Sequence, residues 1–209
     1  MQLSRHAGPL PDAADLPSAL TTAAARLGHR PAIAVVHPDR RDEQGFVSLA
    51  QWAAKGAHLL QSEAGLEPGA RVRIDAPCGW PHAAVCWASW WLGLVVTDGE
   101  ADLVVGTDVG DYVIGDAVDG SPTDATSAEP WAVAVQSFPD RPPSPLGAPD
   151  ALAADVGGAT MTHADLLLSA ARRWRDDLDL TVASDTALAD WLPAVVRPAV
   201  TGRPTTVVV

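Results

Sequence analysis

Apolar stretches alternate with short polar breaks along the first part of the chain, in a pattern that predicts helices and strands in turn. An Ala- and Leu-rich stretch, Leu16–Leu27, ends at Gly28 and predicts a helix. The apolar run Ala32–Val36 predicts a strand. The polar run His37–Gly45 predicts a hairpin loop that leads into Phe46-Val47.

A capping pattern predicts the next helix. Ser48 and Gln51 have the S-x-x-Q spacing of a capping box, and helical periodicity continues from them to Gly65. The turn Pro68-Gly69 then leads into Arg71–Ala76, which predicts a strand.

The following segment predicts a strand–helix–strand unit. Pro81 suits the first turn of a helix, where its missing N–H costs nothing, and His82–Leu92 continues that helix. Leu94–Thr97 predicts the next strand, so the unit has the form of a parallel βαβ crossover. We therefore predict a three-layer α/β/α fold with a parallel-rich sheet. Three tryptophans at i, i+3, i+4 spacing predict a core-facing stripe on the helix: Trp87, Trp90 and Trp91.

A proline-rich segment divides the chain. Residues 139–150 hold five prolines, at positions 139, 142, 143, 145 and 149, and predict a linker. It separates a predicted α/β subdomain at 12–138 from a partial second α/β subdomain at 151–209.

Shorter apolar runs complete the pattern on both sides of this linker. Before it, residues 103–106 and 112–115 predict strands, and 131–138 is a further apolar run. After it, we expect a helix over 164–177 and a final strand over Thr205–Val209. An apolar strand at that position with an unpaired edge would invite pairing with another chain, so we expect a homo-oligomer or a protein partner there.

Charge narrows the classes of partner. The 14 basic and 26 acidic residues give a formal net charge of −12, which argues against a nucleic-acid or anionic-membrane binder. The only lysine is Lys55, and Ile74–Asp140 contains neither Lys nor Arg. Two cysteines, no secretory signal and no apolar stretch long enough to span a bilayer predict a cytoplasmic protein.

No metal site is predicted. Four acidic residues within Ile74–Asp140 lack the alternating spacing of a calcium loop: Asp108, Asp111, Asp116 and Asp119. Cys78 and Cys86 have only His82 nearby and fit a pair of buried thiols better than a zinc site, which favours two close-spaced pairs of ligands.

Several motifs in order resemble the amino-terminal part of the adenylate-forming superfamily, which includes acyl-CoA synthetases. Arg30-Pro31-Ala32 resembles that family's "RPA" strand, and Gly65–Val72 resembles "G-V-x-P-G-D-R-V". Gly158–Leu167 resembles "G-V-x-x-T-H-x-x-L-L", and Val200–Val207 resembles a later "G-A-x-V-V" strand. The size and composition resemble a short actinobacterial family of truncated acyl-CoA synthetase-like proteins.

The resemblance also shows what is missing. In that superfamily a Ser/Thr/Gly-rich loop ending in Pro-Lys-Gly binds ATP phosphates, whereas Ala154–Ala159 has no Ser, Thr or Lys and contains an Asp. The family's aromatic-His, aromatic-Gly-x-Thr-Glu and ribose-binding motifs, and its C-terminal lysine, have no match. We therefore expect a protein that is not an enzyme, with no catalytic residue and no cofactor.

An alternative keeps a ligand pocket. The protein would then be a pseudoenzyme that binds an adenylate, acyl or CoA ligand through five residues: Gly157, Gly158, Thr160, Thr162 and His163. Thr162 as a helix N-cap with Asp165 three residues later explains part of this set more simply. The pocket requires cations, and the downstream candidates are Arg172, Arg173, Arg175, Arg197 and Arg203.

The first hypothesis is thus a non-catalytic truncated relative of acyl-CoA synthetases that acts as a binding or protein-interaction module. The pocket-bearing pseudoenzyme and one half of a split synthetase are the alternatives.

Overall fold

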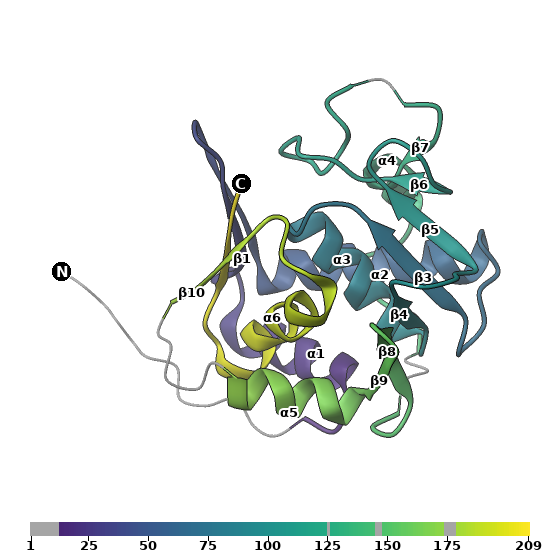
Figure 1. The fold of residues 1–209 in the computed structure, drawn as a ribbon. Helices are drawn as coiled ribbons and strands as arrows, with labels where there is room; N and C mark the ends of the chain where they lie inside the picture. The colour runs from purple at the N-terminus through teal and green to yellow at the C-terminus, as the bar shows by residue number, and fades with distance from the viewer. Residues whose placement is uncertain (1–12, 125, 145–147, 174–178) are drawn as a thin grey trace.

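A computed structural model describes residues 13–124, 126–144, 148–173 and 179–209. The strands form two sheets, and helices fill the space between them and cover their outer ends (Figure 1). The α/β class and the predominance of parallel strands are confirmed, while the strands are divided between two sheets instead of one.

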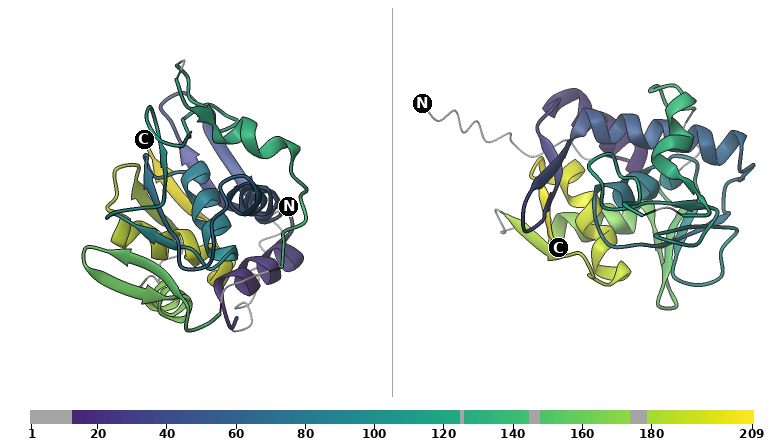
Figure 2. Two further views of the ribbon diagram at one scale, coloured as in Figure 1. Left: turned by 90° about the vertical axis from the view of Figure 1, so that its right-hand side faces the viewer. Right: turned by 90° about the horizontal axis from the view of Figure 1, so that it is seen from above.

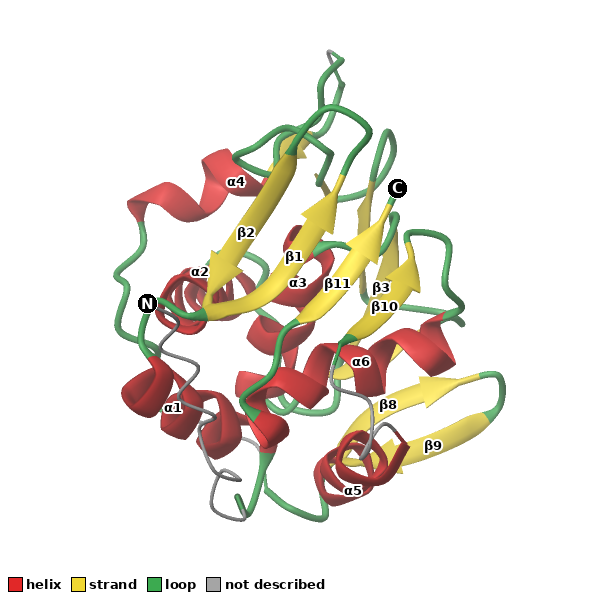
Figure 3. Ribbon diagram, turned by 90° about the vertical axis from the view of Figure 1, so that its left-hand side faces the viewer, coloured by secondary structure: helices red, strands yellow, loops and turns green. Residues whose placement is uncertain are grey.

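The smaller sheet has the order β10-β11-β1-β2. β1 (Pro31–Val36) pairs antiparallel with β2 (Arg41–Gly45) on one side and parallel with β11 (Thr205–Val208) on the other. β10 (Leu180–Ala183) extends the sheet parallel to β11. Figure 3 shows β1, β10 and β11 pointing toward the same end of the molecule.

The larger sheet has the order β7-β6-β5-β3-β4-β8-β9 and is parallel apart from the β8–β9 hairpin. Its strands are β3 (Arg71–Asp75), β4 (Val95–Thr97), β5 (Leu103–Gly106), β6 (Tyr112–Val113), β7 (Glu129–Pro130), β8 (Leu152–Val156) and β9 (Ala159–Thr162).

The helices are α1 (Leu16–Leu27), α2 (Phe46–Ser62), α3 (Trp80–Trp91), α4 (Trp131–Ala134) with the 3-10 turn η1 (Val135–Ser137), α5 (His163–Arg173) and α6 (Leu188–Thr201). α3 contacts β1 of the smaller sheet as well as β3 and β4 of the larger one, so it lies between the two sheets. Every residue of α3 except Pro81 is buried. Among the described residues, no helix is both long and apolar enough to cross a membrane.

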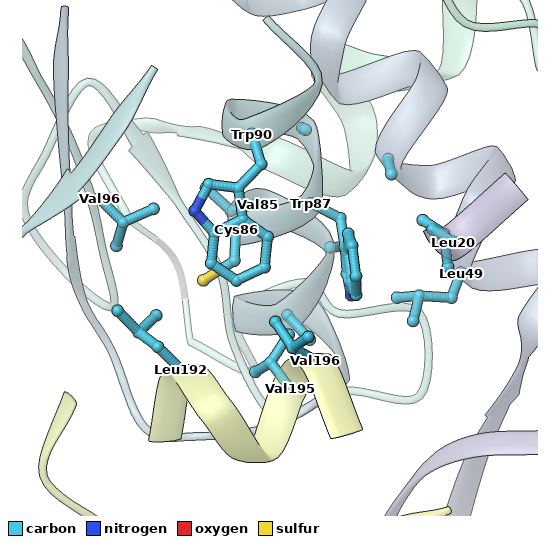
Figure 4. Close-up of a cluster of buried hydrophobic side chains, with 14 of the residues drawn as sticks. Leu20, Leu49, Val85, Cys86, Trp87, Trp90, Val96, Leu192, Val195 and Val196 are labelled. Carbon is cyan, nitrogen blue, oxygen red and sulfur yellow. The ribbon is translucent and has the colours of Figure 1, made fainter. Parts of the chain in front are cut away.

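The predicted tryptophan stripe is confirmed as core. Trp87 and Trp90 meet edge to face, with ring centroids 5.1 Å apart. Figure 4 shows Trp90 on the side of Val96 and Leu192, and Trp87 on the side of Leu20 and Leu49. These side chains come from α1, α2, α6 and β4. Helix α3 therefore connects the parts of the core that lie on its two sides.

The predicted start of α2 is wrong. Arg41–Gly45 is a strand, not a loop, and the helix begins at Phe46 with Gly45 as a cap that forms no side-chain hydrogen bond. Ser48 lies inside the helix, where its Oγ donates to Gln44 Oε1 at 2.5 Å. The polar sequence of β2 is compatible with a strand because only one of its edges is paired, so much of it faces solvent.

The prediction of an unpaired edge on the C-terminal strand is also wrong. β11 lies inside its sheet, hydrogen-bonded to β1 on one side and β10 on the other. The open edges of that sheet are β2 and β10. Pairing with a second chain through β11 therefore has no free backbone groups to use.

Two residues of the proline-rich segment, Asp140 and Pro143, contact the body of the protein. Trp91 Nε1 donates to the carbonyl of Pro143 at 2.8 Å, and Lys55 pairs with Asp140 at 3.2 Å. β8 pairs with β4, and β11 pairs with β1, so each sheet contains strands from before and after residues 139–150.

The contact between α2 and α4 allows a direct stability test. A Cβ added at Gly56 would lie 2.5 Å from Trp131 Cζ2 and 2.9 Å from Ala88 Cβ. Gly56→Ala gains roughly 1 kcal/mol of helix propensity, but overpacking costs about 1–3 kcal/mol. We expect a net loss of stability of up to roughly 2 kcal/mol, measured by urea unfolding. The loss should shrink in a Trp131→Phe background, where the clashing ring atoms are absent; equal losses in both backgrounds would contradict this packing.

Candidate functional site

The predicted ligand-binding residues Gly157 and Gly158 form the two-residue turn of the β8–β9 hairpin. Both have left-handed φ values, 60° and 77°, which suit the tight turns of two-residue hairpins. The backbone N–H of Gly157 donates to the Asp98 carboxylate, at 3.0 and 3.2 Å from its two oxygens. The hairpin projects from the body of the protein (Figure 2). The Gly157 N–H is thus occupied by a carboxylate of the chain itself.

Thr162 and Asp165 cap the start of α5, as predicted. The N–H of Thr162 donates to Asp165 Oδ2 at 3.0 Å, and the N–H of Asp165 donates to Thr162 Oγ1 at 3.1 Å. The backbone and hydroxyl of Thr162 hold the pKa of Asp165 below its usual range. Thr160 lies on the exposed strand β9. These three residues are accounted for by local structure.

His163 is fully buried and has a structural role. Its Nδ1 accepts the backbone N–H of Leu16 at 3.4 Å, which ties the start of α5 to the first turn of α1. Burial lowers the pKa of His163, against an opposing effect of Asp15. Because Nδ1 accepts a hydrogen bond, the neutral ring carries its proton on Nε2.

The structure describes four of the five candidate arginines, and these four do not gather at the hairpin turn. Arg203 lies between α6 and β11. Arg173 pairs with Asp190 at 2.6 Å, and the buried Arg197 donates to the carbonyl of Pro204 at 2.9 Å. Arg172 is exposed on the last turn of α5, and Arg175 lies outside the described residues. The guanidinium near the hairpin is that of Arg71, which pairs with Asp155 of β8.

A cavity of about 340 Å³ lies elsewhere, where the parallel strands of both sheets end. Residues at or just beyond the carboxyl ends of five strands line it: Val35, Ala76, Thr107, Ile114 and Val209. Gly79 and Trp80, at the start of α3, complete its inner wall. We call this cavity the carboxyl-end cleft. Open α/β sheets bind ligands at this position, because loops from several strands converge there.

Hydrogen bonds of Arg40 connect the two sheets along one wall of the cleft. In the loop between β1 and β2, Arg40 Nε donates to Asp42 Oδ2 at 3.0 Å, and His37 Nε2 lies 3.1 Å from the same oxygen. Arg40 Nη2 also donates to the carbonyl of Asp116, in the loop after β6. Arg40 thereby connects a loop of the smaller sheet to a loop of the larger one.

The carboxylate of Asp116 faces a different partner. Thr123 Oγ1 donates to Asp116 Oδ1 at 2.5 Å, and this hydrogen bond holds the pKa of Asp116 below its usual range. Asp116 is therefore ionised at neutral pH, as part of the cleft's acidic lining.

Cys78 and Cys86 are both buried. Burial raises the pKa of Cys78 to about 12, so the side chain is a thiol, which donates to the carbonyl of Thr186. Burial also raises the pKa of Cys86 well above its usual value. Both thiols are free, as predicted. Within the described ranges, no group of three His, Cys, Asp or Glu side chains is placed to hold a metal ion.

His82, in the first turn of α3, is buried behind the cleft wall. Its Nδ1–H donates to the carbonyl of Ala76 at 3.2 Å, its ring meets Trp191 edge-on, and its Nε2 is buried without a hydrogen-bond partner. Burial lowers the pKa of His82 to about 4, so the ring is neutral at pH 7.

Comparison with solved structures identifies the fold. The N-terminal domain of FACL13 from Mycobacterium tuberculosis matches 93% of this chain and 57% of that chain, with a TM-score of 0.67 and 16% identity. The chain has the fold of the amino-terminal domain of adenylate-forming enzymes. A fatty acyl CoA synthetase from M. tuberculosis also has this fold. The match covers 93% of the present chain and 44% of the synthetase, with a TM-score of 0.67 and 17% identity.

Other comparisons agree with the adenylate-forming fold. A fatty acyl-adenylate ligase from L. pneumophila, solved with acyl adenylate and pyrophosphate, matches 94% of this chain and 40% of its own, with a TM-score of 0.68 and 13% identity. A TIGR03089 family protein of M. tuberculosis is 41% identical over 69 residues, which cover 32% of this chain and 28% of that protein. This chain thus spans less than two thirds of each of these neighbours. No protein-family model matches.

Sequence reasoning did not find the carboxyl-end cleft. Its residues come from the ends of five strands and share no motif, and the predicted site lay at the β8–β9 hairpin instead. One signal was available: ligands in open α/β sheets bind beyond the carboxyl ends of parallel strands. This rule points to the loops that follow β3, β5 and β6.

His82 predicts a pH dependence of stability. The unfolded ring titrates near pH 6.5 and the folded ring near 4, so the unfolded state binds more protons between these values. Stability should fall by about 1.4 kcal/mol per pH unit from this residue as the pH drops through that window. His82→Asn, which keeps a donor toward Ala76, should flatten the slope measured by urea unfolding between pH 4 and 7. The exposed His29→Asn is the control; an unchanged slope in His82→Asn would refute the assignment.

Proposed function

We propose that this protein is a non-catalytic relative of adenylate-forming enzymes that acts by binding a small molecule in the carboxyl-end cleft. The observation that carries the non-catalytic part is the β8–β9 turn. Its two residues stand where the resemblance puts a phosphate-binding loop, and its Gly157 N–H is satisfied by Asp98.

The charges around that turn support this reading. Asp98 and Asp155 both lie beside the hairpin, and Arg71 is paired with Asp155. A triphosphate brought to the turn would meet carboxylates instead of the free N–H groups and lysine that stabilise bound phosphate. Lys55 does not compensate, because it is on α2 and pairs with Asp140.

The binding part of the proposal is supported by the shape and position of the cleft. Its volume of about 340 Å³ lies at the lower end of the range of small-molecule pockets, roughly 300–1,000 Å³. The Arg40 link between the two sheets and the buried start of α3 hold its walls before any ligand arrives. A preformed site binds with a smaller loss of conformational entropy.

Two further parts of the proposal concern the cellular location of the protein and its possible protein partners. The free, buried Cys78 and Cys86 fit a reducing compartment, and we propose a cytoplasmic location. A protein partner that adds a strand to a sheet would pair at the open edges β2, β7, β9 or β10.

The first test is a thermal-shift screen of the purified protein against Mg-ATP, AMP, CoA and a library of small fragments. A ligand at a hundredfold excess over its Kd adds about 2.7 kcal/mol and raises the melting temperature by a few degrees. We expect shifts with fragments and none with the nucleotides or CoA. A nucleotide-induced shift, or release of pyrophosphate from ATP with a carboxylic acid, would overturn the non-catalytic assignment and favour the alternatives of a nucleotide pocket or a split synthetase.

The site is tested by filling the cleft. Ser184 lines it from the loop after β10, so Ser184→Trp should abolish the fragment shifts. Thr181→Trp, on an exposed position of β10 outside the cleft, is the matched control and should bind normally. A circular dichroism spectrum and melting temperature near those of the unmodified protein show that each variant folds. Fragments that bind Ser184→Trp with unchanged affinity would contradict the cleft as the site.

A further inference from the structure

The carboxyl-end cleft combines an apolar interior with carboxylates at its rim. The apolar surface comes from both sheets and from the start of α3: Val35, Pro77, Trp80, Ile114, Pro122 and Val209. Trp80 is 3% exposed and packs against Trp52 of α2, with ring centroids 5.2 Å apart. The inner surface is therefore rigid and suits an apolar group.

Four of the ionisable side chains that line the cleft are carboxylates. Asp42, Asp108, Asp116 and Asp124 line it, together with His37. Neither lysine nor arginine is among the described residues that line it. Arg40 lies close by, but its guanidinium is engaged by Asp42 and by the carbonyl of Asp116.

Two of these carboxylates form hydrogen bonds or ion pairs within the cleft wall, and the other two lie at its rim. Asp42 is held by Arg40 and His37, and Asp116 accepts from Thr123. Asp108 follows β5 and Asp124 lies in the loop after β6, and both are exposed at the rim. Asp185, next to the lining residue Ser184, adds a further exposed carboxylate at this end of the molecule.

We propose that the cleft selects an organic cation: a molecule with an apolar body that enters the cleft and an ammonium group that stays at the rim beside Asp108 and Asp124. This inference rests on the proposed function, since it names the ligand class of the same site. Anionic ligands such as free carboxylates or phosphates would meet repulsion from Asp108 and Asp124, and a neutral ligand would gain nothing from these two charges.

The test compares three probes with one apolar body and different heads: 4-phenylbutylamine, 4-phenylbutanol and 5-phenylpentanoate. Affinities are measured by isothermal titration calorimetry at pH 7 and low salt. We expect the amine to bind about tenfold more tightly than the alcohol, and the carboxylate to bind most weakly. The advantage of the amine should decrease as salt rises to about 0.5 M, because exposed charges are screened.

Variants test whether Asp108 and Asp124 cause the preference for the amine. The double variant Asp108→Asn with Asp124→Asn should reduce the affinity for the amine to near that of the alcohol, while leaving the alcohol unchanged. Glu67→Gln with Asp150→Asn removes the same number of exposed charges away from the cleft and serves as the control. A loss of amine affinity that is equal in the two double variants would reduce the effect to net charge and overturn the inference.

The outcomes separate this inference from the proposed function. Equal affinity for all three probes, lost in Ser184→Trp, overturns selection of a cation and leaves the cleft as a binding site. Binding of none of the three overturns selection of a cation, and the fragment screen then decides the proposed function separately. Tightest binding of the carboxylate would also overturn it.

Discussion

The burial of α3 between two sheets is the constraint on which the rest of this structure depends. Its tryptophans and Cys86 contact residues from α1, α2, α6 and β4, so the same helix serves both halves of the core. Large aromatic side chains supply much of the burial energy of such a core. Because α3 follows β3 directly, its packing also fixes where its first turn lies, and that turn forms the inner wall of the carboxyl-end cleft.

Two ends of the molecule have contrasting electrostatics. At the β8–β9 hairpin, the turn N–H and the nearby guanidinium are occupied by carboxylates of the chain itself, which leaves little to attract a phosphate. At the carboxyl-end cleft, an apolar wall is surrounded by carboxylates, some of them engaged and others exposed. The fold is that of the amino-terminal domain of adenylate-forming enzymes, and a shared fold does not require a shared activity.

Local signals in the chain identified most elements correctly. The periodicity around Trp87, Trp90 and Trp91 predicted a buried helix between two parallel strands, and the reciprocal cap of Thr162 and Asp165 was predicted from spacing alone. Such features depend on residues a few positions apart, so the sequence is sufficient. The start of α2 was missed because β2 is polar, and its strand conformation results from pairing with β1, which the local pattern does not contain.

The order of apolar and polar residues determined the α/β class. Short motifs carried the resemblance to adenylate-forming enzymes, and the residue types of Ala154–Ala159 excluded a lysine from the β8–β9 turn. The tertiary structure decided which strands are neighbours: it placed β11 between β1 and β10 and joined loops from five strands into one cleft. The difference has a physical reason. Helix caps and periodicity are set by short-range interactions along the chain, whereas strand order and cavities arise from contacts between residues that are far apart in the sequence.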